Sequence, residues 1–228
     1  RRIFAIFEAI RRNWPIEDIA ELSKIDIWFL REIEKSFNVN PESTPTTILK
    51  MLGWTDEDLD NKDSKKELEN NRVYKLVDTC SAEFVSKTPY LYSTNGTSND
   101  DTASKQKKVV VIGSGPNRIG QGIEFDYCCV HGVSSLKENG YEAIMINSNP
   151  ETVSTDYDTA DKLYFEPLSW NEVKSVLDRE KPDSVIIQLG GQTPLKLAKE
   201  IHNAGFNIAG SSLDVIDSTE DRDLFQKL

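Results

Sequence analysis

The sequence contains few residues with sulfur or imidazole side chains: 3 cysteines, 2 methionines and 2 histidines among 228 residues. The cysteines, Cys80, Cys128 and Cys129, are odd in number, and neither a CxxC pair nor a histidine cluster accompanies them. This pattern excludes a disulfide framework and a zinc site, and it favours ordinary buried thiols in a reducing cytosol. His131 and His202 are isolated, so no metal ligands are expected there.

Long apolar runs are also missing. No stretch approaches the roughly 18 to 20 apolar residues that a membrane span needs, and the first 22 residues mix charged with apolar side chains. Glu8, Glu17, Asp18 and Glu21 carry the wrong sign for an Arg-rich transit peptide. The net charge is −11 and no basic stripe is visible, so nucleic-acid binding is not expected.

Residues 1–92 are predicted to form an all-α helical domain. A first helix places Ile3, Phe4, Phe7 and Ile10 at the spacing of one helix face. The second should begin at Pro15, the third should be capped by Asp26, a fourth should cover residues 46–52, and Thr55 should begin an acidic helix. The block has no catalytic-looking cluster, so its aromatic residues are interpreted as core or interface.

A different pattern follows. Residues 93–107 are polar and rich in Ser, Thr, Asn and Asp, which predicts a flexible linker. Residues 108–218 alternate apolar strands with amphipathic helices, which predicts an open, parallel, Rossmann-like α/β sheet with helices on both faces. The chain is therefore expected to be multidomain, α followed by α/β.

The stretch VVVIGSGPNRIGQGIEFDY, residues 109–127, is a strand, a glycine-rich turn and a helix. A dinucleotide fingerprint has GxGxxG spacing and an acidic end to the second strand. Here the third glycine, Gly120, comes two positions late, and the second strand ends in Asn147. The Walker GK-Ser/Thr signature is absent as well. NAD, FAD or mononucleotide binding stays open at this stage, beside a tight turn in which glycine permits positive φ.

Polar residues gather where the strands end, which is where ligands bind in open α/β sheets. They are Asn117, Arg118, Glu124, Asp126, Asn147, Asn149, Glu151, Gly190, Gly191, Gln192 and Thr193. One alternative is that Glu124 or Asp126 caps the helix, and another is that Glu151 serves a turn. Paired carboxylates repel phosphate, so this edge suits a channel or a protein interface better than a phosphate cradle.

Four ordered motifs carry a family resemblance: GPNRIGQGIEFDYCCVH, NSNPETVSTDYDTADKLYFEP, GGQTPLKLA and EDRDLF. They resemble the start of the C-terminal synthetase half of the carbamoyl phosphate synthetase large subunit. IDIWFLREIE and VYKLVDTCSAEF resemble that family's central oligomerisation domain. Residues 108–218 then correspond to its pre-ATP-grasp domain, and residues 219–228 to the start of an ATP-grasp domain that this sequence does not complete.

The resemblance implies an ATP-dependent carbon–nitrogen ligase that makes carbamoyl phosphate from bicarbonate, ammonia and two ATP. Carbamate made in one half crosses a tunnel to the other, and Gly122, Glu124 and Glu151 match positions that line it. Asn117, Arg118, Gly190, Gly191, Gln192 and Thr193 are expected only to face the site. No catalytic, cofactor or metal residue is expected in these 228 residues, which alone should be inactive.

The same resemblance implies ATP with Mg or Mn in the full-length enzyme. It also implies a glutaminase subunit or fused glutaminase domain, contact with the remaining synthetase halves, self-association through residues 1–92, and a cytoplasmic or mitochondrial location. The product serves arginine, pyrimidine or urea synthesis, and the residues do not choose among these pathways. A competing hypothesis is an autonomous oligomerisation scaffold derived from the family.

Overall fold

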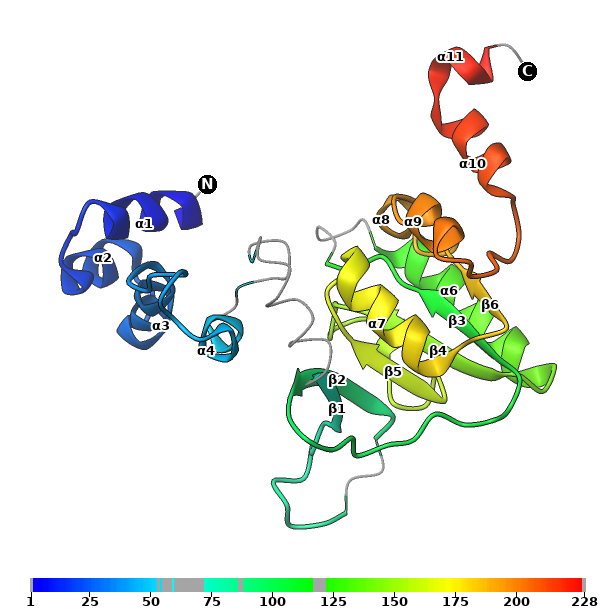
Figure 1. Cartoon of the computed structure of the whole chain (residues 1–228), viewed down its shortest axis with the longest axis horizontal. Helices are drawn as coiled ribbons and strands as arrows, with labels where there is room; N and C mark the ends of the chain where they lie inside the picture. Colours follow the sequence, from blue (N-terminus) through cyan, green and yellow to red (C-terminus); the bar gives the residue numbers. More distant parts are fainter. Residues whose placement is uncertain are drawn as a thin grey trace. The chain divides into compact units, whose positions relative to one another are not determined.

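A computed structural model describes residues 2–52, 54, 59, 72–85, 88–116 and 122–226. The chain divides into two compact units, Arg1–Asn71 and Arg72–Leu228, which we describe separately. Figure 1 shows the helices of the first unit in blue and the sheet and helices of the second from green to red.

The first unit is helical, as predicted for this part of the chain. Asp26 caps the third helix by accepting the N–H of Trp28 at 2.8 Å, and Pro15 stands at the N-cap of the second. The predicted acidic helix start at Thr55 lies outside the described residues. The helices are α1 Arg2–Arg11, α2 Ile16–Ser23, α3 Ile27–Phe37 and α4 Thr46–Met51.

Small aliphatic side chains form the core of this unit, and most aromatic rings stay outside it. Five buried residues make up the main cluster: Ile6, Ile10, Ile16, Ile19 and Leu30. The predicted inner face of α1 is therefore partly wrong, because Phe4 is 70% exposed whereas Ile6 is buried. Trp28 and Phe29 of α3 are likewise more than half exposed. The unit has a narrow core and a broad apolar surface.

The second unit is built on a six-stranded sheet with the order β1-β2-β5-β4-β3-β6. The pair β1–β2 is antiparallel, and all other neighbours are parallel. The strands are β1 Arg72–Leu76, β2 Tyr90–Asn95, β3 Lys108–Ile112, β4 Glu142–Asn147, β5 Lys162–Phe165 and β6 Ser184–Ile186. Beyond the named strands, Ile208 forms one isolated parallel bridge with Val185.

The prediction that residues 72–92 are helical is wrong. These residues supply β1 and the first half of β2, and the two strands pair in register from Arg72 opposite Asn95 to Leu76 opposite Leu91. Short apolar runs cannot be assigned to helix or strand by periodicity alone, and here Tyr and Val side chains pack better on a pleated surface. Tertiary pairing with β5 decides the outcome.

The predicted linker, residues 93–107, is also ordered differently from the expectation. Ser93–Asn95 belong to β2, and the following polar residues are held by hydrogen bonds. The Asn99 side chain accepts the N–H of Tyr74 at 2.8 Å, and the Thr102 carbonyl accepts from Lys162 at 3.0 Å. The polar composition here supplies contacts to the sheet.

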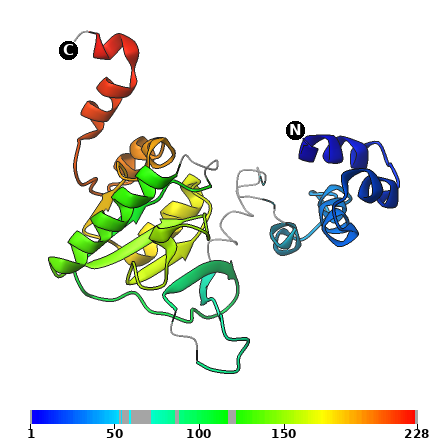
Figure 2. The same cartoon turned by 180° about the vertical axis from the view of Figure 1, so that it is seen from behind.

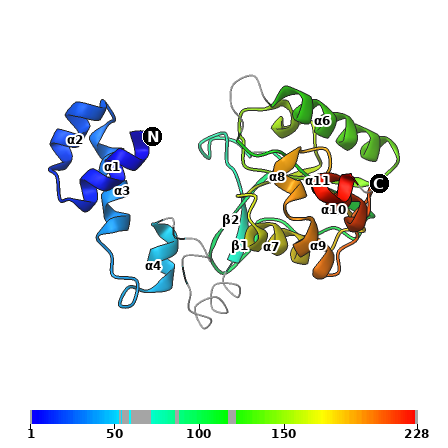
Figure 3. The ribbon, with the colours of Figure 1, turned by 90° about the horizontal axis from the view of Figure 1, so that it is seen from above.

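Helices cover both faces of the sheet, as predicted. Helix α6, Ile123–Glu138, packs Cys129 and Val133 against Val111 and Met145. The opposite face packs against α7, Trp170–Glu180, and α9, Ala198–Asn203. Figure 2 shows α6 in front of the sheet, and Figure 3 shows α6 and α7 on opposite sides of it. Strands buried on both faces explain their uninterrupted apolar sequence.

The remaining elements are short. They are the 3₁₀ helix η1 Val153–Thr155, α8 Gln192–Leu195, α10 Leu213–Glu220 and α11 Arg222–Phe225. Lys196 and Leu197 separate α8 from α9. Within the described residues, no helix combines the length and apolar character that crossing a bilayer requires.

Candidate functional site

The glycine turn after β3 is closed by its own neighbours. The N–H of Gly113 bonds the carbonyl of Ile146 at 2.8 Å, and the N–H of Gly115 bonds Asn147 Oδ1 at 3.1 Å. A Cβ on Gly113 would lie 2.6 Å from Asn147 Nδ2. The Asn147 side chain thus fills the space that a bound phosphate would need beside these two amides. The tight-turn interpretation fits this geometry, and the dinucleotide interpretation does not.

The turn after β6 is equally tight. A Cβ on Gly190 would lie 2.5 Å from the carbonyl oxygen of Ile112, so only glycine allows this approach of two backbones. Gly191 has φ of +72° and faces the Phe125 ring. Gln192 donates to Glu220 Oε1 at 3.3 Å. These contacts give the turn a packing role.

The other residues that were predicted to face the site give no further contact to this turn among the described residues. The side chain of Thr193 is exposed, and Asn117 and Arg118 lie outside the described residues. Gly122 forms the N-cap of α6, with φ of −97° and no side-chain cap.

Asp126 does not cap α6, contrary to one alternative from the sequence. Its side chain is buried, and both carboxylate oxygens accept the N–H of Ser154 at 3.1 Å. The contact joins the first turn of α6 to η1. Sequence reasoning did not identify Ser154, since a serine inside a polar stretch gives no signal of burial.

Glu124 lies two positions before Asp126, Glu151 lies three positions before Ser154, and both glutamates are exposed. The backbone of Glu151 joins a turn in which its N–H bonds Asn149 Oδ1 at 3.0 Å, so the turn alternative holds for the main chain. Among the described residues, neither glutamate side chain makes a hydrogen bond or an ion pair. Two exposed carboxylates thus stand near the carboxyl edge of the sheet.

Glu166, directly after β5, was not predicted as a site residue. It is only 3% exposed, and it accepts hydrogen bonds from the N–H and the hydroxyl of Ser93. Burial raises the pKa of the Glu166 carboxyl above its ordinary value, despite those two bonds. Glu166 therefore holds β2 against the end of β5 and resists ionisation.

The amino edge of the sheet carries a buried ionic cluster that the sequence analysis also missed. Lys108 Nζ lies 3.0 Å from Glu180, and Lys162 Nζ lies 3.2 Å from the same carboxylate. The Tyr164 hydroxyl donates to Glu180 as well. Burial pushes the pKa of Glu180 upward, but the bonds from Tyr164 and Lys108 outweigh it and hold that pKa below its ordinary value.

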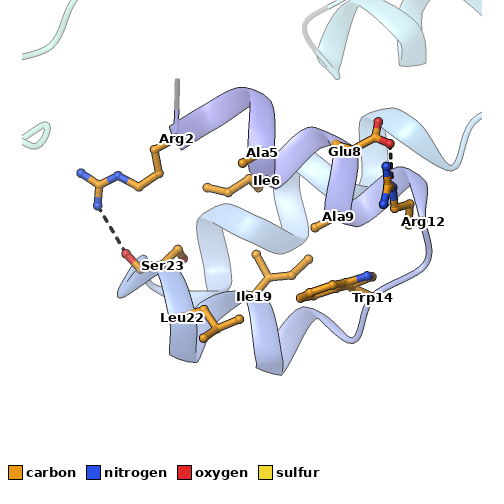
Figure 4. Close-up of a pocket in the computed structure, with 10 residues that line it drawn as sticks. All are labelled: Arg2, Ala5, Ile6, Glu8, Ala9, Arg12, Trp14, Ile19, Leu22 and Ser23. Carbon is orange, nitrogen blue, oxygen red and sulfur yellow. Dashed lines mark hydrogen bonds and ion pairs between the residues drawn. The ribbon is translucent and has the colours of Figure 1, made fainter.

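The first unit contains a cavity of about 430 Å³ between α1 and α2. Figure 4 shows Ile6, Ile19, Leu22 and Trp14 as its apolar lining. At its rim Arg12 bonds Glu8 at 2.7 Å. The cavity presents an apolar surface, and Arg2 at its edge donates to the carbonyl of Ser23 at 3.4 Å.

The prediction that the cysteines are buried thiols is confirmed only in part. Cys129 is buried, and burial raises the pKa of its thiol to about 12, but Cys128 is exposed and Cys80 is half-buried. The prediction of buried thiols therefore holds for Cys129 and is wrong for Cys128. The described part of the chain shows no group of three or more His, Cys, Asp or Glu side chains arranged to hold a metal ion.

Two family models match the chain. The carbamoyl phosphate synthase preATP-grasp domain matches residues 105–218, and the oligomerisation domain of the carbamoyl-phosphate synthetase large chain matches residues 1–82. The match to the oligomerisation domain extends past Asn71, the end of the first unit, into strand β1 and the residues that follow it.

Curated relatives align with the whole chain. The carbamoyl phosphate synthase large chain of Archaeoglobus fulgidus is 47% identical over 250 residues, covering 100% of this chain and 23% of the relative. The large chains of Thermotoga maritima and Deinococcus radiodurans are 49% and 46% identical, with 22% and 24% of their lengths covered. The chain thus spans less than a quarter of the length of these relatives.

Proposed function

Because the chain belongs to the carbamoyl phosphate synthase large-chain family, we propose that its whole protein makes carbamoyl phosphate from bicarbonate, glutamine-derived ammonia and two ATP. ATP, with Mg or Mn, acts in ATP-grasp domains, and the ATP-grasp domain of the C-terminal synthetase half begins near residue 219. A glutaminase subunit or fused domain supplies the ammonia. The reaction takes place in the cytoplasm.

Within that enzyme, residues 1–71 serve assembly and residues 72–218 form part of the wall of the carbamate passage. The observation that carries this proposal is the contrast at the carboxyl edge of the sheet. Asn147 closes the glycine turn against phosphate, whereas Glu124 and Glu151 remain exposed beside it. A passage for a labile intermediate needs shape and exclusion of water more than tight binding.

The test places bulk at Gly122 in the complete synthetase. For Gly122→Phe we expect bicarbonate-dependent ATP hydrolysis to persist while carbamoyl phosphate formation falls, since a blocked passage separates the two half-reactions. Ser135→Phe, at an exposed position near the other end of α6, is the matched control and should leave both rates unchanged. Equal loss of both activities in Gly122→Phe would count against a passage.

A second candidate function is an oligomerisation scaffold, which the apolar surface of the first unit favours. Leu22, Trp28 and Met51 are 73%, 60% and 83% exposed, and such surfaces mark protein contacts. Light scattering on the 228-residue chain should then show association that increases with concentration. A monomer at every concentration would remove this candidate.

A further inference from the structure

The contact between Asp126 and Ser154 joins the two segments that carry the exposed glutamates. Glu124 precedes Asp126 by two positions at the start of α6, and Glu151 precedes Ser154 by three positions before η1. No strand hydrogen bond links these two segments, because α6 packs on the face of the sheet and η1 follows the end of β4. Their spacing therefore depends on side-chain contacts.

Asp126 provides a buried contact of this kind. It is 7% exposed and Ser154 is 1% exposed, so the interaction is shielded from water. Both carboxylate oxygens lie 3.1 Å from one backbone nitrogen, and a hydrogen bond to an ionised group is stronger than a neutral one. The backbone N–H of Asp126 is already used, since it bonds the carbonyl of Gly122 at 2.9 Å. The side chain of Asp126 thus bonds the backbone of η1 and caps no N–H of its own helix.

Asn147 connects Ser154 to the sheet. Its Nδ2 donates to Ser154 Oγ at 3.4 Å, and its Oδ1 accepts from the amides of Gly115 and Asn149 at 3.1 and 3.2 Å. Asn147 is 1% exposed. Ser154 is therefore fixed from two sides, by Asp126 of α6 through its backbone and by Asn147 of β4 through its hydroxyl.

We propose that Asp126 is a positioning residue that holds Glu124 and Glu151 at a fixed separation and so sets the lining of the carbamate passage. This inference rests on the proposed function. Asp126 acts through Ser154, and its buried carboxylate does not meet the migrating intermediate. A displacement of about 1 Å at such a site can cost a large factor in productive transfer.

The experiment uses the complete synthetase with its glutaminase and measures ADP formed per carbamoyl phosphate. Asp126→Ala should raise this ratio about tenfold while bicarbonate-dependent ATP hydrolysis continues. Asp126→Asn should restore a ratio near that of the unsubstituted enzyme, because one oxygen still accepts the N–H of Ser154. Glu138→Ala, at the exposed end of α6, is the matched control and should leave the ratio unchanged.

Three outcomes would overturn the inference. They are an unchanged ratio in Asp126→Ala, a parallel loss of both activities that Asp126→Asn does not rescue, and an unchanged ratio in Asp126→Glu. The last variant keeps the charge and adds one methylene, so it should raise the ratio even if Asp126→Ala fails to fold. Gly122→Phe separates the two proposals: if it uncouples the half-reactions and the Asp126 variants do not, only the inference fails. If neither uncouples them, the passage itself is wrong.

Discussion

The two edges of one sheet handle charge in opposite ways. At the amino edge Lys108, Lys162 and Glu180 are buried or nearly so and bind one another. At the carboxyl edge the buried groups are mostly amides and hydroxyls, and the carboxylates of Glu124 and Glu151 face outward. Removing one partner of an ion pair that is buried inside the protein is strongly destabilising, whereas charges left exposed at the ligand-binding edge of an α/β sheet are available for function.

The largest expected effect tests the amino edge. Glu180→Leu should lower the free energy of unfolding of the second unit by about 3 to 5 kcal/mol, because it leaves the buried ammonium of Lys108 without its closest anion. Urea unfolding with amide hydrogen exchange of β3 as the readout reports on this unit alone. Asp178→Ala removes an exposed ion pair of the same helix and should cost less than about 1 kcal/mol. Similar losses of unfolding free energy in both variants would contradict the idea that the buried charges of the amino edge matter more for stability than exposed ones.

The second prediction concerns crowding at the carboxyl edge. Gly190→Ala should cost about 1 to 3 kcal/mol, since the added Cβ would overlap the backbone of Ile112 and Gly113. Gly140→Ala is the comparison, because its Cβ meets nothing and only its φ of +80° opposes alanine. The same exchange experiment should rank Gly190→Ala as the more damaging change. The reverse order would mean that the turn after β6 can relax.

The third prediction uses pH to compare the two buried glutamates. The pKa of Glu166 is raised, so its contribution to stability is present below the ordinary pKa of glutamate and is lost as pH rises through the higher folded-state value. The pKa of Glu180 is lowered, so its contribution is present at neutral pH and is lost as pH falls through the lower folded-state value. In Glu166→Gln, the stability should therefore decrease less as the pH rises above the ordinary pKa of glutamate.

Thermal unfolding measured from pH 5 to pH 8 checks this expectation. Glutamine can accept the N–H of Ser93 and donate to its hydroxyl, so Glu166→Gln should unfold at the same or a higher temperature at pH 8. Glu138→Gln, at an exposed position, should keep the pH profile of the unsubstituted chain. A profile that Glu166→Gln leaves unchanged would mean that Glu166 stays ionised throughout this range.

The smallest expected effect on stability belongs to the exposed glutamates. Glu124→Gln and Glu151→Gln should each change the free energy of unfolding by less than about 0.5 kcal/mol, as is usual for surface positions. In the complete synthetase the same variants should raise ADP formed per carbamoyl phosphate. A large loss of stability with no change in that ratio would make these residues structural and would remove the contrast between the edges.

The sequence was sufficient for elements whose pattern is long and local. The apolar strands β3 and β4, the helices α6 and α7 and the cap at Asp26 were predicted, because burial on both faces and capping leave direct traces in neighbouring residues. The hairpin β1–β2 was missed because its strands are short and its place depends on β5, which lies far along the chain. The same distance hid the contact of Glu166 with Ser93.

The candidate site was predictable only in part for a related reason. The ends of strands identified Glu124, Asp126, Asn147 and Glu151, but not which of them are buried together. The amino-edge cluster left a trace that was not used, since Lys108, Glu142 and Lys162 each open a strand. Charged residues at aligned strand starts predict cross-strand pairs once the register is known, and the register follows from tertiary pairing.

The position of the β1–β2 hairpin has a consequence for the growing polypeptide on the ribosome. Its docking strand β5 begins 67 residues after β2 ends (162 − 95), which corresponds to roughly 3 to 13 seconds of synthesis. An isolated two-stranded hairpin is marginally stable in water, so this segment waits in a largely unstructured form. The charged and hydroxyl-rich residues that follow it keep the nascent chain hydrated during that interval, until β5 emerges and pairs with β2.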